Sequence, residues 1–112
     1  RAGNKMIEEE SDVLAGFLRA SARGFADFKE DHEACLQILL DNQNEENFPL
    51  SPTVEEKSCQ TLLPLMEKED AKFLSQSEEN WQENIDWMLK MGLIDEAVEV
   101  SDVCAFIEWE QT

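Results

Sequence analysis

The most regular alternation of hydrophobic and polar positions in this 112-residue chain runs through residues 11–29. Residues spaced by three, four and seven positions share one side of a helix, and that side is apolar here apart from one serine. It consists of Leu14, Phe17, Leu18, Ser21, Phe25 and Phe28. Ser11 is placed to cap this helix, and Asp12 favours the positive end of its dipole. The pattern therefore predicts a long amphipathic helix around which the rest of the chain is organised.

Small residues interrupt the same segment at four positions, namely Gly16, Ala20, Ala22 and Gly24. A glycine in a helix interior costs about 1 kcal/mol relative to alanine. Two such glycines in one helix therefore predict that another backbone packs closely against it.

Shorter amphipathic patterns lie on both sides of this segment. Asn4 is placed to cap a short helix over residues 5–10. Asp31 is placed to cap a third helix, whose apolar stripe contains Ala34, Cys35, Ile38 and Leu39. Residues 41–46 are polar and rich in asparagine, which predicts a loop after that helix.

Ser51 followed by Pro52 predicts another helix start, because proline is favoured at the first helical position. The face expected to be buried consists of Val54, Ser58, Leu62, Leu65 and Met66. Pro64 has no N–H to donate, so it should kink or end this helix. Residues 67–76 are mixed in character and predict a loop that tucks in Phe73 and Leu74.

Ser77 begins the last long helical pattern, whose apolar side consists of Trp81, Ile85, Met88 and Leu89. Gly92 fits a left-handed position just after the end of that helix. Ser101 and Asp102 are placed to cap a last short helix. Together the patterns predict an all-α chain with about four main helices and little or no sheet.

Charge narrows the classes of function. The chain has 26 acidic and nine basic residues, which gives a net charge of −17. A phosphate backbone or an anionic membrane surface would be repelled, so we expect no nucleic-acid partner and no membrane-surface binding. No apolar run approaches the roughly 20 residues of a transmembrane helix, and no signal peptide is recognisable in this stretch. We expect the chain to have been cut from a longer protein.

The residue types that usually carry chemistry are sparse. Cys35, Cys59 and Cys104 show no C-x-x-C spacing, which leaves either three free thiols in apolar surroundings or one disulfide and one free thiol. His32 is the only histidine, and it lies in an acidic helix start. Neither a glycine-rich phosphate loop nor a calcium-loop pattern is present. We therefore predict no catalytic residue, no metal ligand and no cofactor.

Two further features have a structural and a functional interpretation. Paired acids such as Glu78 and Glu79 are more typical of solvated helix starts than of acid–base pairs. Trp81 and Trp87 could stack on a ligand, but tryptophans at helical spacing more often lie in a core or an interface.

The order of these pieces resembles one family. FLRA at 17–20, GF at 24–25, EA at 33–34 and ILL at 38–40 are followed by LLPL at 62–65 and WQ at 81–82. ID at 85–86, GLI at 92–94 and VSDV at 100–103 complete the set. The segment is similar to the C-terminal part of periplasmic substrate-binding proteins of ABC importers for nitrate, alkanesulfonates, taurine and thiamine pyrimidine precursors. His32 departs from the family's usual proline, and Cys104–Ala105 replaces a frequent phenylalanine–threonine pair.

The resemblance implies that residues 1–112 form a single helical C-terminal segment of a two-lobe α/β periplasmic binding protein whose N-terminal lobe is absent. The complete protein would bind a small-molecule solute outside the cytoplasm, in the periplasm or lipid-anchored at the cell surface. It would deliver that solute to the ABC transporter membrane permease without doing chemistry. The ligand residues of such proteins lie mostly in the missing lobe, so the ligand-binding residues of this chain are unknown.

Two other functions stay open at this point. One is a fragment of an enzyme of the same superfamily that makes the thiamine pyrimidine. The other is a stand-alone acidic helical module for protein interaction. For the fragment itself, apolar faces that once packed on the missing part lead us to expect a symmetric homodimer.

Overall fold

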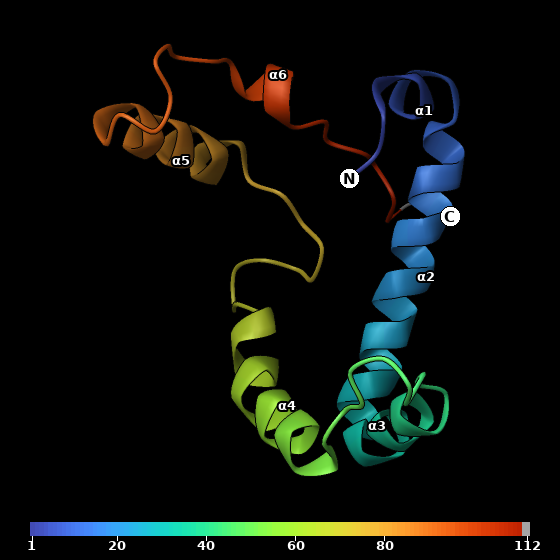
Figure 1. The fold of residues 1–112 in the computed structure, drawn as a ribbon. Coiled ribbons are helices and arrows are strands. Elements are labelled where there is room, and N and C mark those ends of the chain that lie inside the picture. Colours follow the sequence, from blue (N-terminus) through green and yellow to red (C-terminus); the bar gives the residue numbers. More distant parts are fainter. Residues whose placement is uncertain (111–112) are drawn as a thin grey trace. The chain divides into compact units, whose positions relative to one another are not determined.

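The computed structural model describes residues 1–110, which form six helices and no β-strand (Figure 1). The helices are α1 (Asn4–Glu9), α2 (Ser11–Glu30), α3 (His32–Asp41), α4 (Pro52–Met66), α5 (Glu78–Lys90) and α6 (Val100–Val103). The prediction of an all-α fold with four main helices, α2 to α5, is confirmed. None of these six helices is both long enough and apolar enough to cross the hydrocarbon core of a membrane.

The chain divides into two compact units. Unit 1 contains Arg1–Leu18 and the described residues from Leu74 onward, and unit 2 contains Arg19–Phe73. Helix α2 contributes its first turns to unit 1 and its remaining turns to unit 2.

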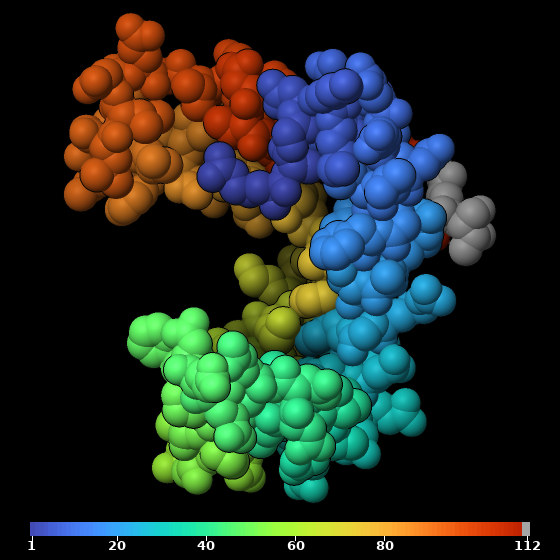
Figure 2. Space-filling view, turned by 45° about the vertical axis from the view of Figure 1, so that its right-hand side comes forward, coloured from blue at the N-terminus to red at the C-terminus, as the bar shows by residue number. Residues whose placement is uncertain are grey.

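In unit 2, α3 begins as its sequence predicts. The Asp31 carboxylate accepts a hydrogen bond from the backbone N–H of Ala34 at 3.0 Å, which satisfies one of the unpaired donors of the first helical turn. The loop after α3 is closed by one side chain. The Gln43 amide donates to the carbonyl of Leu40 and accepts from the N–H of Leu50. This loop lies at the surface of unit 2 (green in Figure 2) and carries Phe48, which is 89% exposed.

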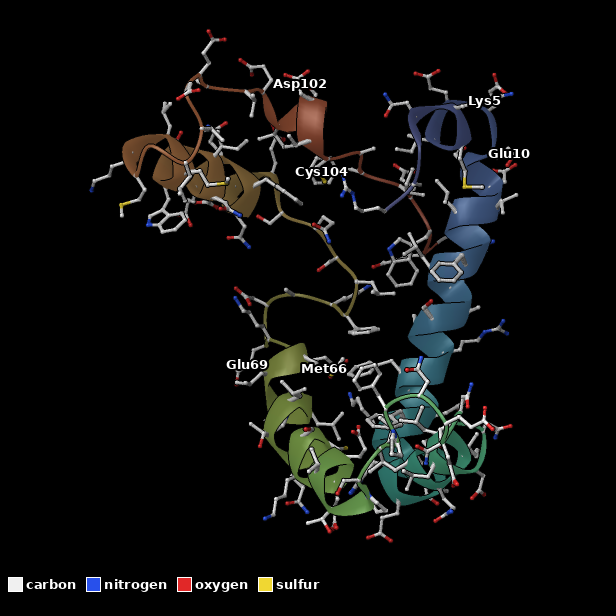
Figure 3. All side chains as sticks on the ribbon, viewed as in Figure 1. Lys5, Glu10, Met66, Glu69, Asp102 and Cys104 are labelled. Atoms are coloured by element: carbon white, nitrogen blue, oxygen red, sulfur yellow. The ribbon has the colours of Figure 1, made fainter. Side chains whose placement is uncertain are left out.

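The core of unit 2 is small. Phe25 of α2 and Cys59 of α4 are its buried hydrophobic residues, and the ring of Phe25 stacks on that of Phe73. The backbone between α4 and Phe73 forms a tight turn, in which the N–H of Ala71 donates to the carbonyl of Lys68. Met66 and Glu69, labelled in Figure 3, mark the end of α4 and this turn. The predicted loop that tucks in Phe73 is therefore confirmed.

Helix α4 differs from its prediction in which side it buries. Its N-terminus has Pro52 at the first helical position, as predicted, but Pro64 lies inside the helix, which ends only at Met66. The face expected to be buried is largely exposed, with Val54 57%, Leu62 53% and Leu65 71% accessible. The buried residue of α4 is Cys59, and α3 packs against this helix.

In unit 1, both ends of α5 follow their sequence signals. The Ser77 hydroxyl accepts from the N–H of Asn80 at 3.2 Å. At the other end, Gly92 adopts φ +67°, its N–H donates to the carbonyl of Leu89, and the N–H of Leu93 donates to that of Met88. These two bonds are the Schellman pattern, which requires a left-handed residue at this position. Ile85 is buried on the apolar side of this helix.

Several local predictions are wrong. Asn4 and Ser11 are predicted to cap the first two helices, but each is instead the first residue of its helix, and Gly3 is the cap of α1. The last short helix begins at Val100 rather than after Asp102, because Glu99 caps it and its N–H donates to the Asp102 carboxylate at 3.1 Å. Asp102 thus serves as the third helical residue of a capping box. The close backbone packing expected at Gly24 is also missing, since a Cβ built there would meet no heavy atom within 4 Å.

Candidate functional site

A hollow of about 220 Å³ lies beside the start of α5, within unit 1. It is lined by Ser75, Gln76, Ser77, Asn80, Trp81 and Asn84. Helix geometry explains this grouping, because residues 77, 80, 81 and 84 are three or four positions apart and therefore share one side of the first turns. The lining offers hydroxyl and amide groups and one indole, and none of its side chains is charged. The hollow therefore offers hydrogen-bonding groups but no charge.

Trp81 is the anchored residue of this hollow. Its indole Nε1–H donates to the Gln76 Oε1 at 2.8 Å, and the ring is half-buried. That bond uses the single donor of the indole and one acceptor position of the Gln76 amide oxygen. The neighbouring Ser77 hydroxyl accepts from the backbone of Asn80.

A second hollow, of about 400 Å³, follows α4 in unit 2. Its lining is the consecutive run of residues 67–72, which includes Glu67, Lys68, Glu69 and Asp70. Glu67 pairs with Lys29 of α2, and both side chains remain more than 40% exposed. A single exposed turn with charges of both signs has no set of side chains converging on one point, so we do not regard it as a ligand site.

The residues with catalytic or metal-binding chemistry are not brought together. Cys35 and Cys104 are half-buried and Cys59 is buried, and all three are free thiols. This agrees with the first of the two alternatives from the sequence. Within residues 1–110, no group of three or more His, Cys, Asp or Glu side chains is arranged to hold a metal ion. His32 is half-buried at the start of α3.

The acidic pair and the tryptophans of α5, which had both a structural and a functional interpretation, lie in different environments. Glu78 and Glu79 are exposed in the first turn of α5, as expected of a solvated helix start. Trp81 lines the hollow, whereas Trp87 on the same helix is exposed and does not. Gln76 is not among the residues predicted from the sequence. The available signal was an amide side chain one residue before a helix-capping serine and five residues before a tryptophan.

The comparisons with known proteins point to one relative. The sequence matches no known protein-family model. It is 38% identical over 101 residues, 90% of the chain, to the formylaminopyrimidine-binding protein of Halalkalibacterium halodurans. The chain spans 31% of the length of that curated relative. The two proteins are homologous over nearly all of this chain, while more than two thirds of the relative has no counterpart here.

Proposed function

We propose that this chain is the C-terminal portion of an extracytoplasmic solute-binding protein that recognises an aminopyrimidine precursor of thiamine and delivers it to the membrane permease of an ABC importer. The observation that carries the proposal is the 38% identity, over 90% of the chain, to a protein named for binding a formylaminopyrimidine. The resemblance of the helical segments to substrate-binding proteins supports the same assignment independently of that name.

The relative is named as a binding protein, which favours a non-enzymatic role over the synthesis of the thiamine pyrimidine. In the complete protein two lobes would close on the solute by a hinge motion and release it to the permease. The helices of this chain would pack against one lobe and support it.

In isolation, the same chain is proposed to form a homodimer through its exposed apolar residues.

The geometry of the hollow beside Trp81 supports placing the main ligand contacts elsewhere. Small-molecule sites bury 70–90% or more of a drug-sized ligand's surface, and they draw on several elements to do so. The hollow draws on residues 75–84 alone and is open to solvent. The groups that enclose an aminopyrimidine would therefore come from the part of the protein outside this chain.

A chimera tests the proposal. The matched segment of the Halalkalibacterium halodurans protein is replaced by this chain, and binding of formylaminopyrimidine is measured by calorimetry. We expect the chimera to bind as the intact relative does, while the relative without the segment does not. A chimera that folds, as judged by a cooperative thermal transition, but binds no formylaminopyrimidine would contradict the proposed solute.

The complete reading frame provides a second test, because the alternatives differ upstream. A signal peptide followed by a further lobe supports the solute-binding protein. A start without a signal peptide, followed by a catalytic motif, would instead favour the enzyme.

A further inference from the structure

The segment that follows α4, residues 67–73, closes unit 2 and is held at its two ends. Residues 67–72 are exposed in unit 2, whereas Phe73 is half-buried. Inside the segment, the N–H of Ala71 donates to the carbonyl of Lys68, which makes one tight turn. The hollow of about 400 Å³ at this turn is lined by residues 67–72 alone, so no side chain of the core contributes to its lining. We call residues 67–73 the strap.

Both ends of the strap are fixed to one short stretch of α2. At its start the Glu67 carboxylate pairs with the Lys29 ammonium group, and at its end the Phe73 ring stacks on the Phe25 ring with centroids 3.8 Å apart. Phe25 and Lys29 are four positions apart on the helix, so they lie on the same side of neighbouring turns. The Lys29 Nζ lies 5.7 Å from the Phe25 ring centroid, within the range of a cation–π interaction. The two residues that hold the strap therefore also interact with each other.

The backbone next to the strap is strained while the strap is closed. Leu74 has φ +65°, in the left-handed region where the Cβ of an L-residue is crowded. It directly follows Phe73, so separating the Phe73 ring from Phe25 would allow this backbone to relax. Exposed segments with few buried contacts open at a lower free energy than the core of a protein. The strap combines such exposure with a strained residue at its end.

We propose that the strap opens and closes on α2 as one unit, and that Phe25 and Lys29 together hold it closed. Opening separates Phe73 from Phe25 and Glu67 from Lys29, and it uncovers the Phe25 ring. It also frees the chain that leaves unit 2 after Phe73, while α2 stays intact as the other chain connection between the two units. The proposal concerns the contacts of unit 2 and does not depend on which solute the complete protein binds.

Limited digestion of the 112-residue chain with trypsin, read by mass spectrometry, tests this. Trypsin cleaves after Lys68 and Lys72 in the strap, and cleavage after Lys57 in α4 provides the reference within unit 2. When cleavage is slow compared with closing, its rate follows the population of the open form. We expect Phe25→Leu to accelerate cleavage at both strap sites about fivefold relative to Lys57, and Lys29→Met about threefold. Both substitutions leave the sequence of the strap, and hence its recognition by trypsin, unchanged.

The matched controls are Phe48→Leu, at an 89% exposed ring, and Lys5→Met, at an exposed lysine that pairs with Glu9. Both should leave cleavage of the strap unchanged. Because Phe25 is a core residue, Lys29→Met decides the outcome if Phe25→Leu loosens the whole of unit 2. In Lys29→Met, acceleration after Lys68 alone would show that the two ends open separately, and equal acceleration after Lys57 would show that unit 2 unfolds as a whole. Either result would overturn the proposal, and so would unchanged cleavage at both strap sites.

Discussion

The ring of Phe25 in α2 stacks on the ring of Phe73, with centroids 3.8 Å apart and planes inclined by 18°. This contact ties the turn that follows α4 to the second half of α2. Lys29, one turn further along α2, lies 5.7 Å from the Phe25 ring centroid and pairs with Glu67 at the end of α4. The ion pair is exposed and contributes at most about 1 kcal/mol, so aromatic burial is the larger contribution to the stability of unit 2.

Replacing Phe25 by alanine should therefore destabilise the chain by about 3 kcal/mol, because a buried aromatic ring and its stacking partner are lost together. Urea denaturation followed by circular dichroism measures the change. Phe48→Ala removes the same side chain from an 89% exposed position and should cost less than about 0.5 kcal/mol. A double-mutant cycle with Phe73→Ala should give a coupling of about 1 kcal/mol. Strict additivity of the two substitutions would show that the rings do not interact in solution.

Two glycines should respond to alanine in opposite directions. Gly92 has φ +67°, where a Cβ is strained, so Gly92→Ala should destabilise by about 1–2 kcal/mol. Gly24 lies inside α2 with open space around its Cβ position, so Gly24→Ala should stabilise by about 0.5–1 kcal/mol. Thermal unfolding of both variants in the isolated chain checks the signs. A destabilising Gly24→Ala would indicate a close neighbour that the structure does not show.

These two glycines also show which features could be predicted from the sequence. The helix starts at Ser77 and Asp31 and the turn at Gly92 were predicted correctly, because each depends on a hydrogen bond or a backbone preference within a few residues. The caps predicted at Asn4, Ser11 and Ser101–Asp102 were misplaced by one or a few residues, because neighbouring residues can also precede a helix. The role of Gly24 depends on what approaches α2, and the covered side of α4 depends on where α3 packs. Periodicity identifies an apolar stripe on α4, but it does not say which of two adjacent apolar sides a neighbouring helix will choose.

The candidate site was less predictable than the fold. Trp81 was recognised as having both a core and a ligand-stacking interpretation, but the hydrogen bond from its indole to Gln76 depends on how the chain enters α5. No enclosed solute site could be predicted from this sequence, because the hollow is open and is lined by residues 75–84 alone. The proposed solute class comes from the resemblance and from the relative's name, and neither identifies a contact.

The isolated chain should bind formylaminopyrimidine weakly or not at all. The hollow beside Trp81 holds about 220 Å³ but is open and is lined from one short stretch. Calorimetry on the 112-residue chain should show no micromolar binding, whereas the intact Halalkalibacterium halodurans protein provides the positive control. Micromolar binding by the isolated chain would move the ligand site into this segment.

The last prediction concerns self-association of the isolated chain through the apolar face of α4 that contains Val54, Leu62 and Leu65, which are exposed. Two copies can cover this face by packing on each other, and a standard interface buries about 800 Å² per partner. The net charge of −17 on each copy opposes association, and ordinary salt screens such repulsion beyond about 8–10 Å. We therefore expect a symmetric dimer whose fraction rises with ionic strength and with protein concentration, measured by light scattering. Leu65→Asp should abolish the dimer because it places a charge on the stripe, whereas Gln60→Asp adds the same charge to the opposite side and should leave most of the dimer intact. A strict monomer at high protein concentration in both low and high salt would refute the prediction, and equal loss of dimer in the two variants would show that net charge, rather than this face, controls association.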